Sequence, residues 1–209
     1  MRHSYAIFLK EYFKNYREIG SVVPDSRRCL DALLKNVPFD NINSIIEFGA
    51  ASGALTREII RRKKKGALLL AFEKNPVFFT ELQKNIEGED VFLLNASVFA
   101  SVASLTGKFG FALSGVDCIV STLPCSNIDV NNLLRESVVP LLNPGGLFIQ
   151  YMHVISLLKG FHLRRILALY FRTIIPSIVI GNLPPVIIYN CSSQKRPARF
   201  ELKKNYTKK

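Results

Sequence analysis

The chain has 209 residues, of which 48% are hydrophobic and 21% are charged. This length fits one large domain or two small ones, and the composition excludes a disordered, collagen-like or disulfide-scaffold protein. Lys and Arg number 28 against 16 Asp and Glu, so the formal net charge is +12. Such an excess predicts an anionic partner, either nucleic acid or an anionic membrane surface.

The four cysteines are scattered along the chain, and neither a Cys-x-x-Cys pair nor a Cys/His cluster with zinc spacing occurs. We therefore expect reduced thiols and no metal site. Residues 1–20 lack the apolar core and cleavage site of a signal peptide, and no apolar run reaches about 18 residues. A cytoplasmic protein without a membrane-spanning helix is predicted.

Residues 4–17 have the pattern of an amphipathic helix. Aromatic side chains recur at three- and four-residue steps, while Lys10, Lys14 and Arg17 share another face. Aromatic residues beside a basic face are typical of helices that lie in a membrane interface. The alternative is a helix that packs its aromatic side chains on the rest of the domain.

The following region alternates helices and strands. Strands are predicted over 44–48, 67–72, 91–94, 118–121, 147–150, 174–180 and 186–189. Helices are predicted over 26–36, 54–64 and 131–139 and from Pro76 onward, with Asp25 and Asn75 as N-caps. A turn is expected at 143–146, where the sequence reads Asn-Pro-Gly-Gly. This alternation predicts an α/β fold with a mainly parallel seven-stranded sheet and helices on both faces.

Two segments near the C-terminus are basic and less regular. Residues 157–172 mix four basic residues with apolar ones, which fits either a second membrane-interface element or a core helix with a basic edge. Residues 193–209 lack the apolar residues needed for a core, so we expect a flexible basic tail. The predicted organisation is a helix over 1–20, one domain over 21–192 and this tail.

A candidate cofactor site lies in the run from Ile45 to Gly53. A strand ends there in Glu47 and leads through a turn containing Gly49 into a helix, and glycine lets the backbone approach a ligand closely. Glu73 ends the next strand, where a carboxylate can accept hydrogen bonds from both hydroxyls of a ribose. A dinucleotide site needs a fuller glycine pattern, and Glu47 would repel a pyrophosphate. S-adenosylmethionine, with a positive amino group and no phosphate, fits better; the alternative is an ordinary α/β loop with two solvated acids.

On these and other motifs the chain resembles the class I S-adenosylmethionine-dependent methyltransferases, which have a Rossmann-like fold. Within them it is similar to the bacterial phospholipid N-methyltransferases, relatives of ribosomal RNA adenine dimethylases. The resemblance extends to Asn190. Its motifs are the basic aromatic run 8–15, the segment 20–26, the glycine turn 47–53, Phe72-Glu73, Ser121-Thr-Leu-Pro124, Leu142-Asn-Pro-Gly-Gly146, Phe148-Ile-Gln-Tyr151 and Asn182-Leu-Pro-Pro185.

The resemblance implies a set of cofactor contacts at strand ends: Glu47, Gly49, Ala51, Gly53, Glu73, Asn95 and Ser121. Two positions depart from the family pattern. Ala51 replaces the middle glycine of the turn. Asn95-Ala-Ser97 replaces an acid that is common after the third strand, so Asn95 or Ser97 is the expected partner of the adenine.

The run from Ser121 to Cys125 bears on the substrate. Related adenine-N6 methyltransferases carry Asn or Asp followed by Pro-Pro-Tyr or Leu-Pro-Tyr, whose amide and aromatic ring hold a flipped base. This chain reads Ser-Thr-Leu-Pro-Cys there, which argues against a base substrate. Residues of the N-terminal helix are instead expected to contact the membrane and its lipid: Phe8, Lys10, Tyr12, Phe13, Lys14, Tyr16 and Arg17.

We therefore expect a phospholipid N-methyltransferase that acts on phosphatidylethanolamine or a related aminolipid, peripheral on the inner face of the cell membrane. Tyr151 and His153, after the fifth strand, are candidates to orient or deprotonate the amine, and the alternative for His153 is an ordinary partly buried histidine. Two other functions stay open. One is an rRNA adenine N6-methyltransferase, which the basic tail favours; the other is a catalytically degenerate lipid-binding domain, which Ala51 and Asn95 favour.

Overall fold

The fold was taken from a computed structural model of the chain, which describes residues 26–99, 115–125, 128–154, 157–180, 182 and 185–194. The expected N-terminal helix, with all seven of its membrane-contact residues, lies outside these ranges. So do the expected N-cap Asp25 and the basic tail from residue 195 onward. Among the described helices, none has both the length and the apolar character needed to cross a bilayer.

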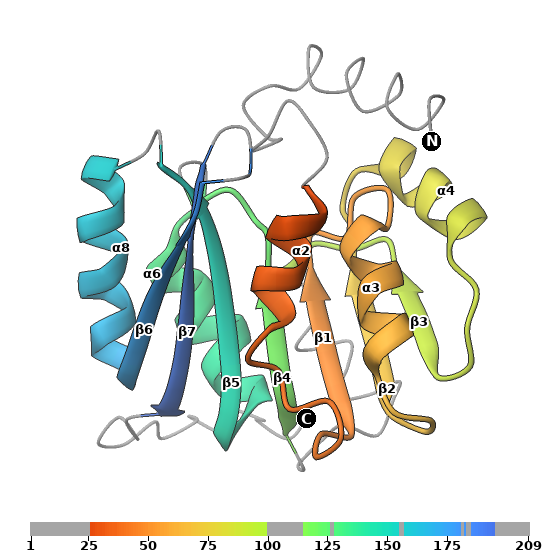
Figure 1. Ribbon diagram of the computed structural model, residues 1–209, viewed down its shortest axis with the longest axis horizontal. Helices are drawn as coiled ribbons and strands as arrows, with labels where there is room; N and C mark the ends of the chain where they lie inside the picture. The colour runs from red at the N-terminus through yellow and green to blue at the C-terminus, as the bar shows by residue number, and fades with distance from the viewer. Residues whose placement is uncertain are drawn as a thin grey trace, which may run out of the picture.

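A seven-stranded sheet forms the centre of the fold, in the order β3-β2-β1-β4-β5-β7-β6 (Figure 1). The first five strands pair in parallel, whereas β7 pairs antiparallel with both β5 and β6. The expected mainly parallel sheet is therefore confirmed. The strands are β1 (Ser44–Phe48), β2 (Leu68–Phe72), β3 (Val91–Leu94), β4 (Val116–Ser121), β5 (Leu142–His153), β6 (Phe171–Val179) and β7 (Val186–Gln194).

Helices cover both faces of the sheet (Figure 1). One face carries α2 (Arg27–Leu34), α3 (Ala54–Arg62) and α4 (Pro76–Asn85). The opposite face carries α6 (Val130–Leu133), the π-helical η1 (Leu134–Val138), α7 (Val139–Leu141) and α8 (Leu157–Tyr170). Across the first face, the guanidinium of Arg62 bridges α2 and α3 through Asp31 and Glu58.

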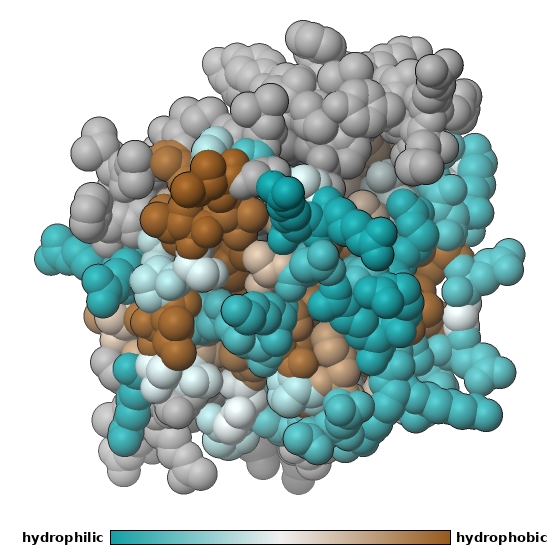
Figure 2. Space-filling view, in the orientation of Figure 1, coloured by the Kyte–Doolittle hydropathy of each residue, from teal (hydrophilic) through white to brown (hydrophobic). Residues whose placement is uncertain are grey.

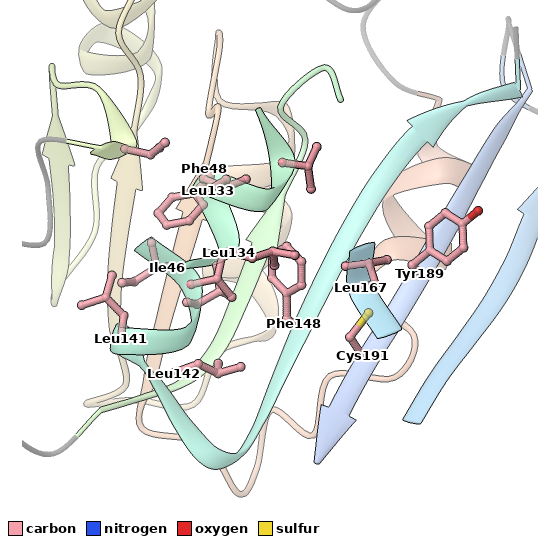
Figure 3. Close-up of a cluster of buried hydrophobic side chains, with 14 of the residues drawn as sticks. Ile46, Phe48, Leu133, Leu134, Leu141, Leu142, Phe148, Leu167, Tyr189 and Cys191 are labelled. Carbon is pink, nitrogen blue, oxygen red and sulfur yellow. The ribbon is translucent and has the colours of Figure 1, made fainter. Parts of the chain in front are cut away.

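The central strands β1, β2 and β4 have apolar side chains on both faces, because both faces of the sheet are buried there. In β1, Ile46 and Phe48 point to the α6–α8 face, where they pack with Phe148 and Leu134 (Figure 3). Ile45 points the other way, into the cluster under α2 and α3. Glu47 follows Ile45 on that second face and is the exception to this apolar pattern.

The structure corrects the predicted boundaries in several places. Helix α2 is capped by Ser26, whose hydroxyl accepts from the N–H of Cys29. The stretch from residue 157, expected to be less regular, forms the helix α8, as the core-helix alternative predicted. Strand β7 continues to Gln194, which is two residues into the segment expected to be tail.

The largest correction concerns the expected turn at 143–146, which lies inside β5. Val116 pairs with Leu142 and Cys118 pairs with Leu147, so these residues form an irregularity in a continuous strand. The side chain of Asn143 donates to the carboxylate of Asp117 at 2.8 Å. This side-chain bond holds the irregularity against β4, and a pattern of turn residues alone does not reveal it.

Candidate active site

The turn between β1 and α3 places three residues in the left-handed region: Gly49 (φ +87), Ala51 (φ +48) and Gly53 (φ +90). The N–H groups of Gly49 and Ala50 both donate to the carbonyl of Phe72, which ends β2. A Cβ on Gly49 would lie 3.1 Å from the hydroxyl of Thr122, and one on Gly53 would lie 2.9 Å from Ile86. Both glycines are therefore required by backbone conformation and by close packing.

Glu73, directly after β2, closes this turn. One carboxylate oxygen accepts from the N–H of Ala51 at 2.8 Å, and the other accepts from the N–H of Asn75 at 2.7 Å. Burial raises the pKa of Glu73, and the two N–H donors partly offset that rise. Each oxygen accepts one bond and retains capacity for a second, so the carboxylate can also accept from a ligand hydroxyl.

Glu47 lies in β1 with no exposed surface, and among the described residues neither of its oxygens has a hydrogen-bond partner. Burial raises the pKa of its carboxyl to about 8, and the charge of Glu73 adds to the rise. The hydroxyl of Thr56, in α3, acts to lower the pKa, although the two groups do not reach hydrogen-bonding geometry. A buried carboxyl beside the glycine turn thus lacks the donor that buried polar groups normally have.

The loop after β4 is attached to the same turn. The Thr122 N–H donates to the carbonyl of Phe48 at 3.0 Å, and the Thr122 hydroxyl donates to the carbonyl of Gly49 at 2.9 Å. Ser121 precedes it with a fully buried hydroxyl that has no partner among the described residues. The expected cofactor positions in β1 and β4 are therefore held side by side.

Gln150 is a site residue that the sequence interpretation missed. Its side-chain amide is fully buried in β5 and donates to the carbonyls of Tyr151 at 2.8 Å, Leu123 at 3.2 Å and Ser121 at 3.4 Å. These bonds fix the course of the loop after β4. A polar residue within an otherwise apolar strand was the signal that could have identified it.

Tyr151 and His153 are brought together at the end of β5. The phenol oxygen of Tyr151 lies 2.7 Å from Nε2 of His153, and the two rings meet edge to face with centroids 4.9 Å apart. Tyr151 is buried and His153 is partly buried. Tyr151 packs in the same cluster as Ile45, so the pair lies on the sheet face that also carries Glu47.

Asn95 follows β3 and supports the neighbouring strand end. Its amide donates to the carbonyl of Glu73 at 2.9 Å and to that of Lys74 at 3.3 Å. Ser97 accepts instead from the N–H of Phe99. All nine described candidates thus lie at the carboxyl edge of the sheet, where ligands bind in open α/β folds.

Two hydrogen bonds at this edge join parts of the chain that are distant in the sequence. The side chain of Asn182, between β6 and β7, accepts from the N–H of Ser26 at 2.8 Å. The carbonyl of Pro185 accepts from the N–H of Val154, just after β5. Residues of the expected Asn-x-Pro-Pro motif therefore connect the start of α2 to the strand end that carries Tyr151 and His153.

The chain is similar to known proteins at low sequence identity. No family model matches the chain. Over 191 residues it is 24% identical to an ornithine lipid N-methyltransferase from Singulisphaera acidiphila, covering 90% of this chain and 96% of that protein.

Solved structures share the fold at low sequence identity. An O-methyltransferase from Bacillus cereus in complex with SAH superposes with a TM-score of 0.64 at 15% identity, covering 91% of both chains. Human methyltransferase-like protein 13 in complex with SAH gives a TM-score of 0.60 at 19% identity, covering 81% of this chain and 80% of that one. These comparisons confirm the expected methyltransferase fold and the resemblance.

Proposed function

We propose that this chain is an S-adenosylmethionine-dependent methyltransferase that methylates the amine of a lipid headgroup, in phosphatidylethanolamine or a related aminolipid, at an anionic membrane surface. The observation that supports the proposal most directly is the buried carboxyl of Glu47, which has no hydrogen-bond partner within the described part of the chain and lies beside the turn that Glu73 closes. The likeness to an ornithine lipid N-methyltransferase, whose name specifies an amine-containing lipid, supports the substrate class.

The residues at the turn fit S-adenosylmethionine. The carboxyl of Glu47 lacks a donor, and the amino group of the cofactor is a donor of the right charge. Glu73 retains acceptor capacity for ribose hydroxyls, and Asn95 and Ser121 lie at the neighbouring strand ends. The left-handed backbone at Gly49 and Gly53 packs the turn closely against Thr122 and Ile86 and so fixes its shape beside Glu47 and Glu73.

When bound, the cofactor supplies an activated methyl group and its own leaving group, so the protein mainly aligns and shields the reaction. The lipid amine must be neutral to attack. Tyr151 and His153 form a hydrogen-bonded pair that can take a proton from the amine at His153 and orient that ring through the phenol. Gln150 and Thr122 hold the loop that borders this space.

The two alternative functions have less support. An adenine substrate needs an amide and a stacking ring after β4, and the side chain of Thr122 instead bonds to the carbonyl of Gly49. A degenerate domain is favoured by Ala51, but Glu73 holds this residue in the left-handed conformation that a glycine would adopt. The turn therefore keeps a conformation suited to a ligand despite the substitution.

The test is methyl transfer from labelled S-adenosylmethionine to vesicles containing phosphatidylethanolamine or ornithine lipid, with unmodified ribosomal RNA as a parallel substrate. We expect label in lipid, and a lower rate when residues 1–17 are deleted. Label in RNA alone would favour the RNA methyltransferase and would mean that the positive charge of the chain serves to bind nucleic acid. Folded protein that binds no S-adenosylmethionine would overturn both enzyme functions and leave the lipid-binding domain.

A further inference from the structure

Strand β6 forms one edge of the sheet and ends at the same side as the active site. Its last residue, Val179, pairs with Val186 of β7, which in turn pairs with His153 of β5. Neighbouring strands lie about 4.8 Å apart, so the end of β6 is roughly 10 Å from His153. A partner that binds the end of β6 therefore lies close to the candidate catalytic pair, Tyr151 and His153.

Large aliphatic side chains are exposed at this end. Ile178 is 66% exposed and Ile180, directly after the strand, is 81% exposed. Ile175, on the opposite face of the strand, is 57% exposed. In the space-filling view, hydrophobic side chains gather over the upper part of β6 and β7 (Figure 2). Two exposed isoleucines on one face at the end of an edge strand, Ile178 and Ile180, indicate a surface that another apolar body covers.

The stretch of chain that forms this edge carries charges of one sign. Residues 137–200, which include α8, β6 and β7, contain neither Asp nor Glu. Arg164 and Arg165 of α8 are exposed, and Arg164 lies near enough to Tyr189 of β7 to act against the burial-induced rise in its pKa. Aliphatic side chains beside guanidinium groups match an anionic lipid surface, which offers both hydrocarbon and negative charge.

A second copy of the chain fits this edge less well. An exposed edge strand can pair with another strand through its free backbone groups, but β6 carries Pro176 in its middle, and proline has no N–H to donate. Arg172 adds a charge near the start of the strand. Both features are devices that protect edge strands from pairing.

We propose that the exposed end of β6, with Ile178 and Ile180 and the flanking basic side of α8, docks on an anionic lipid bilayer and places the candidate catalytic pair at the headgroup layer. The inference rests on the proposed function for its choice of a lipid partner. It assigns membrane contact to the C-terminal edge of the domain, independently of the N-terminal helix.

The test compares Ile180→Glu with Leu169→Glu in the full chain. Leu169 is a matched control because it is 66% exposed but lies at the far end of α8, beside the start of β6. Binding is measured by co-sedimentation with vesicles of phosphatidylethanolamine and phosphatidylglycerol. We expect Ile180→Glu to weaken binding about tenfold, as loss of one inserted isoleucine implies, and Leu169→Glu to bind like wild type. Ile178→Thr/Ile180→Thr, which keeps β-branched side chains, should also bind more weakly.

Two further measurements separate the possible outcomes. Binding of S-adenosylhomocysteine without lipid should be equal in all variants, because β6 does not contribute to the glycine turn. Wild-type binding to vesicles by both isoleucine variants would overturn the docking surface and leave the proposed methyl transfer intact. A wild-type dimer that these variants dissociate would assign the edge to a second copy instead. Vesicle binding that depends on Ile180, without methylation of any lipid, would uphold the surface and overturn the proposed function.

Discussion

The carboxylate of Glu73 accepts a hydrogen bond from the backbone N–H of Ala51 at 2.8 Å, across two parallel strands. Ala51 has a φ of +48, a conformation that is unfavourable for any residue with a Cβ. The end of β2 thus stabilises the conformation of the turn that follows β1. A residue expected only to bind ribose also maintains the shape of the site.

Glu73→Ala should therefore change two properties. We expect weaker binding of S-adenosylhomocysteine, because an acceptor for ribose hydroxyls is lost. We also expect the free energy of unfolding to fall by about 1–3 kcal/mol, because the N–H groups of Ala51 and Asn75 lose their acceptor in a largely buried place. Calorimetric titration and chemical denaturation measure these changes, with Glu89→Ala, at an exposed acid, as the control. Unchanged affinity would remove Glu73 from the binding site.

Ala51→Gly should stabilise the turn. A left-handed conformation costs a non-glycine residue roughly 1–2 kcal/mol, and the added flexibility of glycine takes back part of that gain. We expect a net increase of about 0.5–1 kcal/mol in the free energy of unfolding, with affinity for S-adenosylhomocysteine at least equal to that of wild type. If only the glycine variant binds the ligand, the natural chain is a degenerate methyltransferase.

The strands and the helix at Asn75-Pro76 could be predicted because their signals are local. Continuous apolar runs mark strands buried on both faces, and Asn75 caps α4 with its own side chain, as expected. The roles of Glu73 and Gln150 could not be predicted in this way. Their side chains bond to backbone groups that come close only after the strands have paired. The hydrophobic periodicity of the sequence does not indicate which residues these are.

Stability should fall as the pH rises between about pH 5 and pH 8. The pKa of Glu47 is raised to about 8 in the native state from an ordinary value of 4.5, so in this range the native state binds more protons than the unfolded state. The slope of unfolding free energy against pH is then negative, and the full loss is at most about 5 kcal/mol. Chemical denaturation at a series of pH values measures it.

Glu47→Gln isolates the contribution of this group. The variant keeps the shape of the side chain and cannot ionise, so the pH dependence should become shallower. It should not vanish, because burial also raises the pKa of Glu73. Glu58 does not contribute to the slope in this pH range. The hydrogen bond from Arg61 lowers the pKa of its carboxyl, burial raises it, and with Arg62 the net effect is a pKa of about 2, so Glu58 titrates at lower pH. A slope equal to that of wild type would mean that Glu47 is ionised in the folded protein.

Tyr151→Phe tests the pair at the end of β5. The phenol oxygen lies 2.7 Å from Nε2 of His153, so its removal takes away one group that orients the imidazole. We expect methyl transfer to fall about tenfold or more, with a shifted pH profile, while the free energy of unfolding drops by only about 1 kcal/mol. Affinity for S-adenosylhomocysteine should be unchanged. A loss of stability without a change in the pH profile would make His153 an ordinary partly buried histidine.

Gln150 and Asn190 are buried residues with amide side chains on the adjacent strands β5 and β7. They differ in the hydrogen bonds that these amides make. The two hydrogens of the Gln150 amide nitrogen are shared among three carbonyls, and only its amide oxygen has no partner among the described residues; for Asn190 both polar side-chain atoms have none. Replacing each by leucine should therefore have opposite effects, although both changes remove an amide of similar size.

Gln150→Leu should lower the free energy of unfolding by about 1–3 kcal/mol, because the carbonyls of Leu123 and Tyr151 each lose an amide donor. It should also loosen the loop after β4 and so reduce methyl transfer more than ligand affinity. Asn190→Leu should raise the free energy of unfolding by about 1–2 kcal/mol, because it removes an uncompensated buried amide. Thermal and chemical denaturation of the two variants measure the difference. Destabilisation by Asn190→Leu would mean that a buried water molecule satisfies that amide.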